Sequence, residues 1–323
     1  MQMTCPLGTL FLPQRGGPEK CEMSDAWANR PGHGPTDRPC WAAAMMCRVP
    51  YTPVHALVSL PLAGRRARRA LPPDLLLWAL PAFAVGAMVP DAPLFLDVLV
   101  PGTDELARPT HRLLGVVTVD LALTLAFTAL WVLVVRGPFL AALPRRSAPV
   151  PDASTRAAHP LAVVGTVVGF AVAGTLTHIL WDDFTHLRGT AVQTWDVLRT
   201  PVAGVTAYKY LQHGSSLVGF ATIAVLTVRW WRRAEPVSPP QHLRSAVLAV
   251  GAGAAVGTVG AVVRLVATDH AVTVFSLARL AATHPVLGAG LGLVVWAVAC
   301  TTVRHRDGRP SAALGAAPVQ PPG

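Results

Sequence analysis

Three polar residues spaced four apart carry the clearest chemical signal in this sequence. His178, Asp182 and His186 lie at the end of a run of about twenty apolar residues that begins at Leu161, long enough to span a bilayer. On a helix this spacing puts them on one face, where an imidazole and a carboxylate can hold one metal ion or share one proton. The rise from His178 to His186 is roughly 12 Å at helical pitch, too long for both to bind one ion. A site would use His178 with Asp182, or Asp182 with His186, plus ligands from elsewhere, and Gly189 is predicted to end the helix.

Earlier apolar segments supply further groups for such a site. Asp91 follows a proline in the apolar run 75–98, where a carboxylate is costly unless it is paired or ligating. Thr110 is expected to be the N-cap of the next helix, with His111 in the first turn, where the helix dipole favours a neutral imidazole that can bind a metal. Asp120 is a second carboxylate at membrane depth, roughly two and a half turns below His111.

Composition points to a membrane protein. Hydrophobic residues make up 52% of the chain and charged residues 14%, with a mean hydropathy of +0.45, which excludes an ordinary soluble domain. The net charge of +10 is compatible with nucleic-acid binding, but the arginines fall in short clusters between apolar runs, as topogenic charges do. Nucleic-acid binding is therefore the weaker interpretation, and the lipid bilayer is the expected partner. The five cysteines match neither a paired zinc spacing nor an even disulfide framework.

The apolar runs predict an all-α, polytopic transmembrane helical bundle with about six spans and a short N-terminal membrane helix. Open sheet edges cannot survive in lipid, so no β-sheet is expected. The short helix, residues 53–64, is only about 18 Å long and is compatible either with a surface helix or with a short span in a thinned bilayer. The expected spans are residues 75–98, 113–135, 161–189, 215–231, 246–267 and 285–303.

The distribution of arginines predicts an orientation in the cytoplasmic membrane. If the strongly basic loops all face the cytoplasm, the His and Asp residues lie near the extracytoplasmic face. His55 would join them if residues 53–64 cross the bilayer, and would lie elsewhere if this segment rests on the cytoplasmic surface. The residues placed at the outer face are Asp91, His111, Asp182, His186 and His213.

Several of these residues belong to motifs that resemble a known family. In order, the motifs are Thr52-Pro-Val-His55, Val89-Pro-Asp91, Thr110-His111, His178-Ile-Leu-Trp-Asp182-Asp-Phe-Thr-His186 and Leu211-Gln-His213-Gly-Ser-Ser. They resemble DUF4184, a bacterial membrane family of unknown function, over about residues 50–233. The order is more distantly similar to that of membrane-bound metal-dependent hydrolases, in which a serine commonly follows the Thr-His pair; Arg112 stands there in this chain.

The resemblance and the apolar runs divide the chain into four parts. The two spans after the family-like region each carry a face of small residues suited to close packing, namely Gly253 with Gly257 and Gly288 with Gly292. The four parts are a disordered leader at 1–48 that precedes a candidate start at Met45 or Met46, the family-like membrane domain at 49–233, two further spans within 234–303, and a disordered tail at 304–323.

The first functional hypothesis is a metal-dependent hydrolase at the extracytoplasmic face, acting on a lipid-like or phosphate-bearing substrate. Zinc or a similar divalent ion would activate a water, Asp183 or His186 would move protons, and Lys209 would hold an anionic head group. The five candidate metal ligands are His55, Asp91, His111, His178 and Asp182.

The alternative is a non-enzymatic membrane protein, either a proton- or ion-coupled carrier or a scaffold. Buried Asp and His residues serve proton relays as readily as metals, and Asp120 fits a relay better than a surface metal site. Any single intramembrane His or Asp more often only hydrogen-bonds a neighbouring helix. The sequence therefore leaves open whether the protein is an enzyme.

Overall fold

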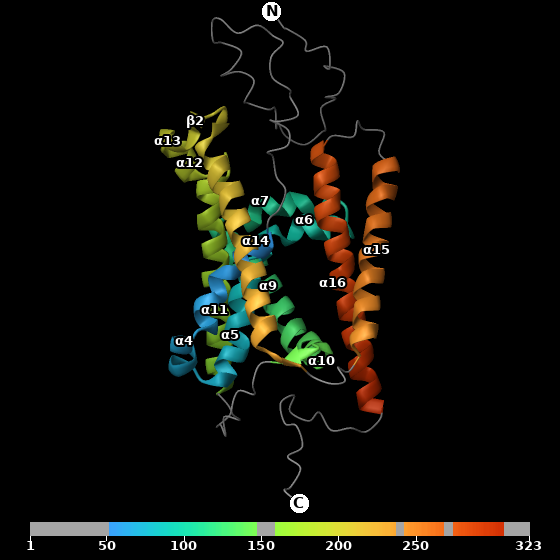
Figure 1. Ribbon diagram of the computed structural model, residues 1–323. Helices are drawn as coiled ribbons and strands as arrows, with labels where there is room; N and C mark the ends of the chain where they lie inside the picture. The colour runs from blue at the N-terminus through green and yellow to red at the C-terminus, as the bar shows by residue number, and fades with distance from the viewer. Residues whose placement is uncertain (1–51, 147–158, 237–241, 268–273, 307–323) are drawn as a thin grey trace, which may run out of the picture.

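The computed structural model describes residues 52–146, 159–236, 242–267 and 274–306, which form an almost wholly helical bundle (Figure 1). Within these residues five helices are long and apolar enough to cross a membrane, and a bent helix pair makes a sixth. The expected all-α multi-pass membrane fold is confirmed. The predicted leader and all but three residues of the predicted tail lie outside the described residues. The five candidate spans are Val119–Ala142, Pro160–Thr194, Ala207–Arg233, Leu243–Ala267 and Leu277–Val303, of which the second joins a long helix to a short one that follows it.

The first described element is a short apolar helix inside the bundle. It consists of η2 (Thr52–Ser59) and α3 (Leu60–Ala63) and is followed by the basic helix α4 (Arg65–Ala70). Its length is well below the roughly 20 residues of a full span. However, η2 packs against α5, α11 and α14 instead of lying apart on a surface. This packing favours the alternative in which residues 53–64 form a short span, which stays a prediction.

The second element is a broken span. The helix α5 (Pro73–Gly86) is followed by η3 (Val89–Asp91) and α6 (Ala92–Leu96), and the two parts are bent by 46°. Proline explains the break, because Pro90 has no backbone N–H to continue the helix, while Pro93 suits the first turn of α6. The bend exposes backbone carbonyls to other hydrogen-bond donors.

One of these carbonyls changes the local structure around Thr110. After η4 (Thr103–Leu106), Thr110 ends α7 (Ala107–Thr110) and His111 lies in the turn before α8 (Leu113–Val117). The buried Thr110 hydroxyl donates to the Pro90 carbonyl at 2.9 Å and lies 3.0 Å from the Ala107 carbonyl. The prediction of an N-cap at Thr110 is therefore wrong, because Thr110 ends α7 and its hydroxyl donates to the carbonyl of the distant Pro90.

The next span starts later and ends later than expected. The backbone at Thr118 leaves the helical region, with φ −118° and ψ −95°, so α9 (Val119–Ala129) begins after it. The helix continues through a π-helical segment, η5 (Leu130–Val135), into α10 (Arg136–Ala142).

The helix that carries the His178 motif, α11 (Pro160–Thr185), ends before Gly189. His186 is extended, with φ −118° and ψ 139°, and caps the helix end, so the prediction that Gly189 ends it is wrong. A glycine is required at position 189 for a different reason. A Cβ there would lie 2.1 Å from the Asp183 carbonyl oxygen, so a larger residue would clash with the backbone. Two short helices follow, α12 (Thr190–Thr194) and α13 (Asp196–Arg199), before the long α14 (Ala207–Arg233).

Glycines allow α5 and α11 to pack in close contact. A Cβ on Gly174 would lie 2.4 Å from the Phe83 carbonyl oxygen, and one on Gly86 would lie 2.5 Å from the Ala171 carbonyl oxygen. Thr175 Oγ1 donates across this contact to the Gly86 carbonyl at 3.2 Å. The close approach brings the face of α11 that carries His178 against the end of α5.

The last two helices, α15 (Leu243–Ala267) and α16 (Val274–Arg306), form a hairpin beside the rest of the bundle (Figure 1). The predicted small-residue faces meet: a Cβ on Gly253 would lie 2.1 Å from the Gly288 carbonyl oxygen, and one on Gly292 would lie 2.2 Å from that of Ala249. Pro285 lies inside α16 without ending it.

The hairpin contacts the other helices through two separate groups of residues. One is an apolar cluster of Val135, Ala142, Trp296 and Ala297, at η5, α10 and α16. The other is ionic and centres on the buried Asp97, whose Oδ2 lies 2.9 Å from Arg264 Nη2 and 3.3 Å from Arg279 Nη2. Arg279 also pairs with Asp104 at 3.1 Å.

The described residues contain two very short strand pairs, so the expectation of no β-structure is wrong in this detail. β1 (Arg145–Arg146) pairs with β4 (Glu235–Pro236), and β2 (Pro201–Val202) pairs with β3 (Val205–Thr206), both antiparallel. Each strand has two residues and lies in a connection between helices. Pairing of this kind is compatible with a membrane protein, because the hydrocarbon restriction on sheet edges applies only within the spans.

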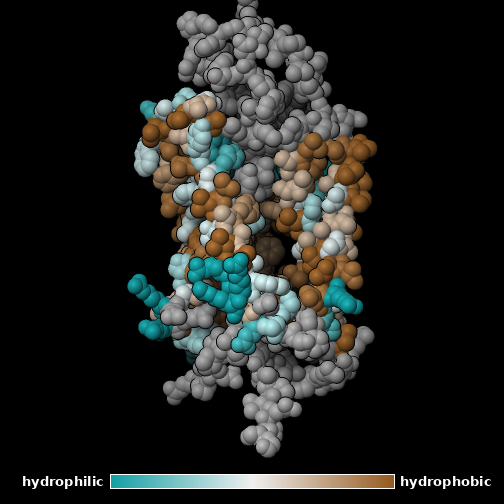
Figure 2. Space-filling view, in the orientation of Figure 1, coloured by the Kyte–Doolittle hydropathy of each residue, from teal (hydrophilic) through white to brown (hydrophobic). Residues whose placement is uncertain are grey.

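The surface of the bundle is divided as expected for a protein in lipid. On the face in view hydrophobic side chains predominate along the helices, whereas strongly hydrophilic ones gather at the end where α4 and the C-terminal end of α14 lie (Figure 2). The β1–β4 pair lies at the same end (Figure 1). The basic segments thus share one end of the bundle.

Candidate metal centre

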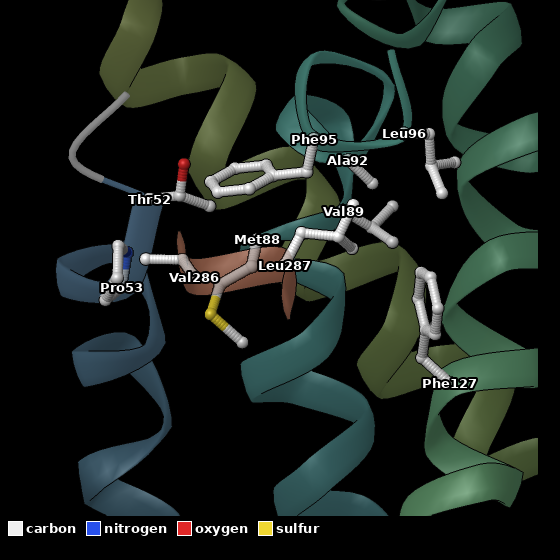
Figure 3. Close-up of a pocket in the computed structure, with 10 residues that line it drawn as sticks. All are labelled: Thr52, Pro53, Met88, Val89, Ala92, Phe95, Leu96, Phe127, Val286 and Leu287. Carbon is white, nitrogen blue, oxygen red and sulfur yellow. The ribbon is translucent and has the colours of Figure 1, made fainter. Parts of the chain in front are cut away.

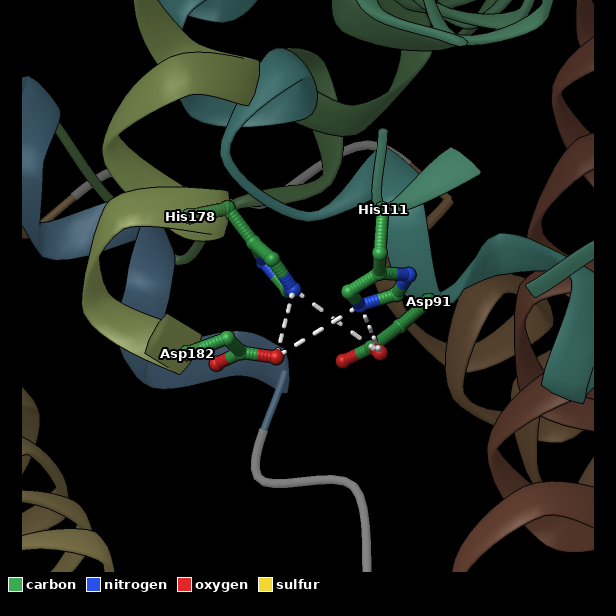
Figure 4. Close-up of side chains that lie close together, drawn as sticks. All are labelled: Asp91, His111, His178 and Asp182. Atoms are coloured by element: carbon green, nitrogen blue, oxygen red, sulfur yellow. Dashed lines mark ion pairs between the residues drawn. The ribbon is translucent and has the colours of Figure 1, made fainter. Parts of the chain in front are cut away.

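Four side chains from three separate parts of the chain meet in the bundle (Figure 4). Asp91 lies at the bend after α5, His111 follows α7, and His178 and Asp182 lie one turn apart on α11. One ligand atom of each lies within 4.8 Å of those of the other three. The predicted convergence of these residues is confirmed. Of the two pairings open for α11, His178 with Asp182 belongs to this group of four, although His186 Nδ1 also lies 3.5 Å from Asp182 Oδ2.

The spacing of the four ligand atoms suits a tetrahedral ion. His178 Nε2 lies 3.4 Å from Asp182 Oδ2 and 3.8 Å from Asp91 Oδ1. His111 Nε2 lies 3.5 Å and 3.7 Å from the same two oxygens. Four ligands at about 2.0–2.2 Å from a tetrahedral zinc are about 3.3–3.6 Å apart. The four nitrogen–oxygen distances are therefore within a few tenths of an ångström of those in an occupied site.

Backbone carbonyls fix the orientation of both imidazoles. His178 Nδ1 lies 2.8 Å from the Ala87 carbonyl oxygen, and His111 Nδ1 lies 2.7 Å from that of Ala107. Because a carbonyl only accepts, each Nδ1 carries the hydrogen, and in a neutral ring the Nε2 lone pair then faces the carboxylates. His178 Nε2 is buried without a hydrogen-bond partner among the described residues. Such a buried acceptor costs about 1–3 kcal/mol, and a metal ion would satisfy it.

Thr52 and His55 from η2 complete the surroundings of the four residues. Thr52 Oγ1 donates to Asp91 Oδ2 at 2.7 Å, which leaves Asp91 Oδ1 directed at the imidazoles. His55 Nε2 lies 3.9 Å from Asp182 Oδ1, and its ring centroid is 4.2 Å from that of His178. His55 therefore joins the site, as expected if residues 53–64 cross the bilayer, although it lies outside the closest group of four.

The family of the chain can now be stated. The sequence model described as Domain of unknown function (DUF4184) matches residues 49–303. The chain belongs to the DUF4184 family. The match reaches beyond the stretch of about 50–233 over which the motifs resemble this family, and it includes α15 and most of α16. No curated protein and no solved structure matches the chain, and its similarity to metal-dependent hydrolases stays a prediction.

A chain of polar contacts leads from the candidate metal centre to α14. His186 Nδ1 lies 3.5 Å from Asp182 Oδ2, and Gln212 Nε2 lies 3.1 Å from His186 Nε2. Lys209 Nζ donates to Gln212 Oε1 at 2.9 Å. Lys209 can only donate, so it orients the Gln212 amide with its NH₂ toward His186, and a neutral His186 then carries its hydrogen on Nδ1, facing Asp182. Sequence reasoning missed Gln212, although its spacing of three from Lys209 on a helix gives a signal.

Asp183 lies apart from this chain of contacts. Its carboxylate accepts hydrogen bonds from the backbone N–H groups of Thr190 and, at 2.9 Å, Ala191, at the start of α12. Both of its oxygens thus support the turn after α11. A part in proton transfer for Asp183 stays a prediction.

The pKa of His111 reflects its place between two carboxylates. Burial lowers this pKa, but the hydrogen bond with Asp182 and the charge of Asp91 outweigh burial, so the pKa of His111 is raised. The expectation that His111 lies in the first turn of a helix is wrong, because it lies in the turn before α8.

A second buried polar stripe lies on α9. Asp120, Thr124 and Thr128 are spaced four apart and are fully buried. Neither carboxylate oxygen of Asp120 and neither threonine hydroxyl has a hydrogen-bond partner within the described ranges. Such groups are rare in protein interiors, and each calls for an explanation such as a water or an ion.

Proposed function

We propose that this DUF4184 protein is a metal-dependent hydrolase of the cytoplasmic membrane. Its ion, with zinc as the first candidate, would be held by Asp91, His111, His178 and Asp182. One observation carries the proposal. In both imidazoles Nδ1–H donates a hydrogen bond to a backbone carbonyl, and Nε2 is directed at two carboxylate oxygens 3.4–3.8 Å away. This orientation is the one that a metal site needs, because the carbonyl holds Nδ1–H and the Nε2 lone pair is available to the ion, and the four ligand atoms lie at nearly tetrahedral spacing.

The exposed side of the site gives the direction of approach. His178 is fully buried, whereas the His111 side chain is 28% exposed. A bound divalent ion supplies a Lewis acid that polarises a substrate oxygen and lowers the pKa of a water. Hydrolytic zinc keeps a position open or expands to five ligands. A substrate would therefore approach the four residues from the His111 side.

Other residues near the site are suited to proton transfer and to binding an anionic group. The proposed proton carrier is His186, because its Nδ1 hydrogen faces Asp182 and its ring is partly exposed. Lys209 adds a positive charge at the end of the same chain of contacts, which suits a phosphate-bearing substrate. The basic helix α4 and the basic C-terminal end of α14 lie at the other end of the bundle (Figure 1), and the rule that such segments face the cytoplasm supports a site at the extracytoplasmic face.

A second candidate function is a proton- or ion-coupled carrier, favoured by the stripe on α9. Asp120 is fully buried among membrane helices, and its carboxylate has no hydrogen-bond partner in the part of the chain that is described. An intramembrane carboxylate of this kind is typical of relays and ion paths. In this alternative the four-residue cluster would exchange protons and hold no ion.

Metal content separates the two functions. Protein purified in detergent after growth with zinc should contain about one ion per chain, measured by elemental mass spectrometry. The double variant His178→Ala, Asp182→Ala should lose it, whereas the control Asp196→Asn, at a side chain that is 90% exposed, should keep it. The purified protein should also hydrolyse lipids of phosphatidylglycerol vesicles in a reaction that stops on chelation. A metal-free wild-type protein would support the carrier.

A further inference from the structure

An open apolar cavity of about 230 Å³ lies beside the candidate metal centre (Figure 3). Its wall combines η2, the bend after α5, α6, α9 and α16, and the surface that it presents is apolar. The lining side chains used below are Thr52, Val89, Ala92, Phe95, Phe127 and Leu287.

The cavity and the candidate metal centre share a wall. Thr52 lines the cavity, and its hydroxyl donates to Asp91 Oδ2 at 2.7 Å. Val89 and Ala92 also line it, and both lie within two residues of Asp91 in the chain. A molecule in the cavity would therefore lie next to the polar cluster.

The size and lining of the cavity select its occupant. Pockets that enclose a whole small molecule measure about 300–1,000 Å³, so this cavity suits one segment of a longer molecule. An apolar wall offers that segment no hydrogen bonds, which fits a hydrocarbon chain. Val286 and Leu287 of the membrane-spanning α16 form part of the wall, so the source of such a chain is the bilayer.

The attachment of the hairpin leaves room for entry. The hairpin is held through the Asp97 ion pairs and through the apolar cluster around Trp296, and Leu287 lies between Arg279 and Trp296 along α16. In the space-filling view the surface is hollowed between α14 and α16, with hydrophobic residues behind (Figure 2). A lipid chain can thus reach the cavity from the side of the bundle.

We propose that the cavity binds a hydrocarbon chain of a bilayer lipid and holds the polar part of that lipid at the Asp91, His111, His178 and Asp182 cluster. This inference rests on the proposed function, since it names the substrate of the same site as a lipid with at least one long chain. Phe95, Phe127 and Leu287 would contact the chain.

Photolabelling tests the proposal directly. The full chain is reconstituted in nanodiscs that contain phosphatidylglycerol with a diazirine near the middle of one acyl chain, irradiated, digested and mapped by mass spectrometry. We expect labelling at Phe95, Phe127 and Leu287 above that at the lipid-facing Leu133, which is 69% exposed. Leu287→Trp fills the cavity, and displacing two methylene groups should lower this labelling on the order of tenfold. The matched control Leu291→Trp, one turn further along α16 at a side chain that is 42% exposed, should leave it unchanged.

The outcomes separate this inference from the metal proposal. Leu287→Ala enlarges the cavity without a clash, so if Leu287→Trp fails to fold, labelling that increases in Leu287→Ala supports the chain site. Labelling of the cavity residues no stronger than that of Leu133, or equal in all variants, would overturn it. Metal content is measured on the same samples, and we expect Leu287→Trp to keep it. Labelling of the cavity residues in a protein without bound metal would support the lipid-chain site and reject the hydrolase. Bound metal without labelling of the cavity residues would reject the lipid-chain site and leave the metal proposal standing.

Discussion

Loss of the hydrogen bond from Thr52 to Asp91 should weaken metal binding while all four proposed ligands stay in place. Thr52→Val removes the hydroxyl that lies 2.7 Å from Asp91 Oδ2 and keeps nearly the same shape. Both residues are largely buried, so water cannot replace the bond, which contributes about 1.5–3 kcal/mol as a hydrogen bond to a charged group. Partners of metal ligands typically contribute about 10–100-fold in affinity, or about 1.4–2.7 kcal/mol. The two ranges agree, so we expect zinc affinity to fall by about 10–100-fold.

The assay is a competition titration of purified protein against a chromogenic zinc chelator. Thr124→Val is the matched control, because it makes the same substitution at a buried hydroxyl that has no hydrogen-bond partner in the described part of the chain. We expect this control to keep its zinc affinity. Its free energy of unfolding should rise by about 1 kcal/mol, because an unsatisfied buried hydroxyl is removed.

Equal zinc affinities for Thr52→Val and the wild type would refute the assignment of Asp91 as a metal ligand. A similar loss of affinity in Thr124→Val would show that the effect comes from general loosening of the bundle. Only a loss confined to Thr52→Val supports the geometry.

Three further predictions concern packing, charge and the ion itself. Gly174→Ala places a Cβ 2.4 Å from the Phe83 carbonyl oxygen, so it should lower the free energy of unfolding by about 1–3 kcal/mol and weaken zinc binding. The control Gly169→Ala has open space around it and should stabilise the helix by up to about 1 kcal/mol. Equal shifts of the melting temperature in the two variants would contradict the close α5–α11 contact. Burial raises the pKa of Asp97, but the Gly102 amide and Arg264 outweigh it and hold this pKa below the ordinary 3.8, so the stabilisation is complete above that value and is lost as pH falls through the lowered pKa. The melting temperature measured as a function of pH should fall at acidic pH in the wild type, and this fall should be absent in Asp97→Asn. Identical pH profiles for the two proteins would reject the ion pair as a source of stability. Chelation should lower the unfolding free energy by about 2.7 kcal/mol relative to protein with zinc at a hundred times its dissociation constant, and an unchanged melting temperature would argue against a specific ion.

The fold and the meeting of the ligands follow from strong sequence signals. Long apolar runs fix the spans, because a bilayer accepts few other structures. The spacing of four between His178 and Asp182 fixes one face of α11, and charge distribution puts Asp91 and His111 at the same level. These are patterns over many residues, which local details do not overturn.

The wrong predictions concern positions where a distant partner decides the structure. Thr110 has the composition of an N-cap, yet its hydroxyl donates to the carbonyl of Pro90, twenty residues earlier. Gly189 is predicted to end a helix, yet a glycine is required there because the Asp183 backbone lies too close for a Cβ. The orientation of His178 likewise depends on the carbonyl of Ala87, which lies 91 residues away along the chain. Local sequence does not contain these contacts.

The separation of the ligands along the chain also sets an order of events during synthesis. Asp91 and His111 leave the ribosome well before His178 and Asp182, and Asp182 follows Asp91 by 91 residues. At about 5–20 residues per second this interval lasts roughly 5–20 s. During that time the first helices would enter the membrane with only two of the four candidate ligands, so they would hold an ion weakly or not at all. We therefore expect metal capture to be a late step of biogenesis that occurs only after α11 has docked against α5.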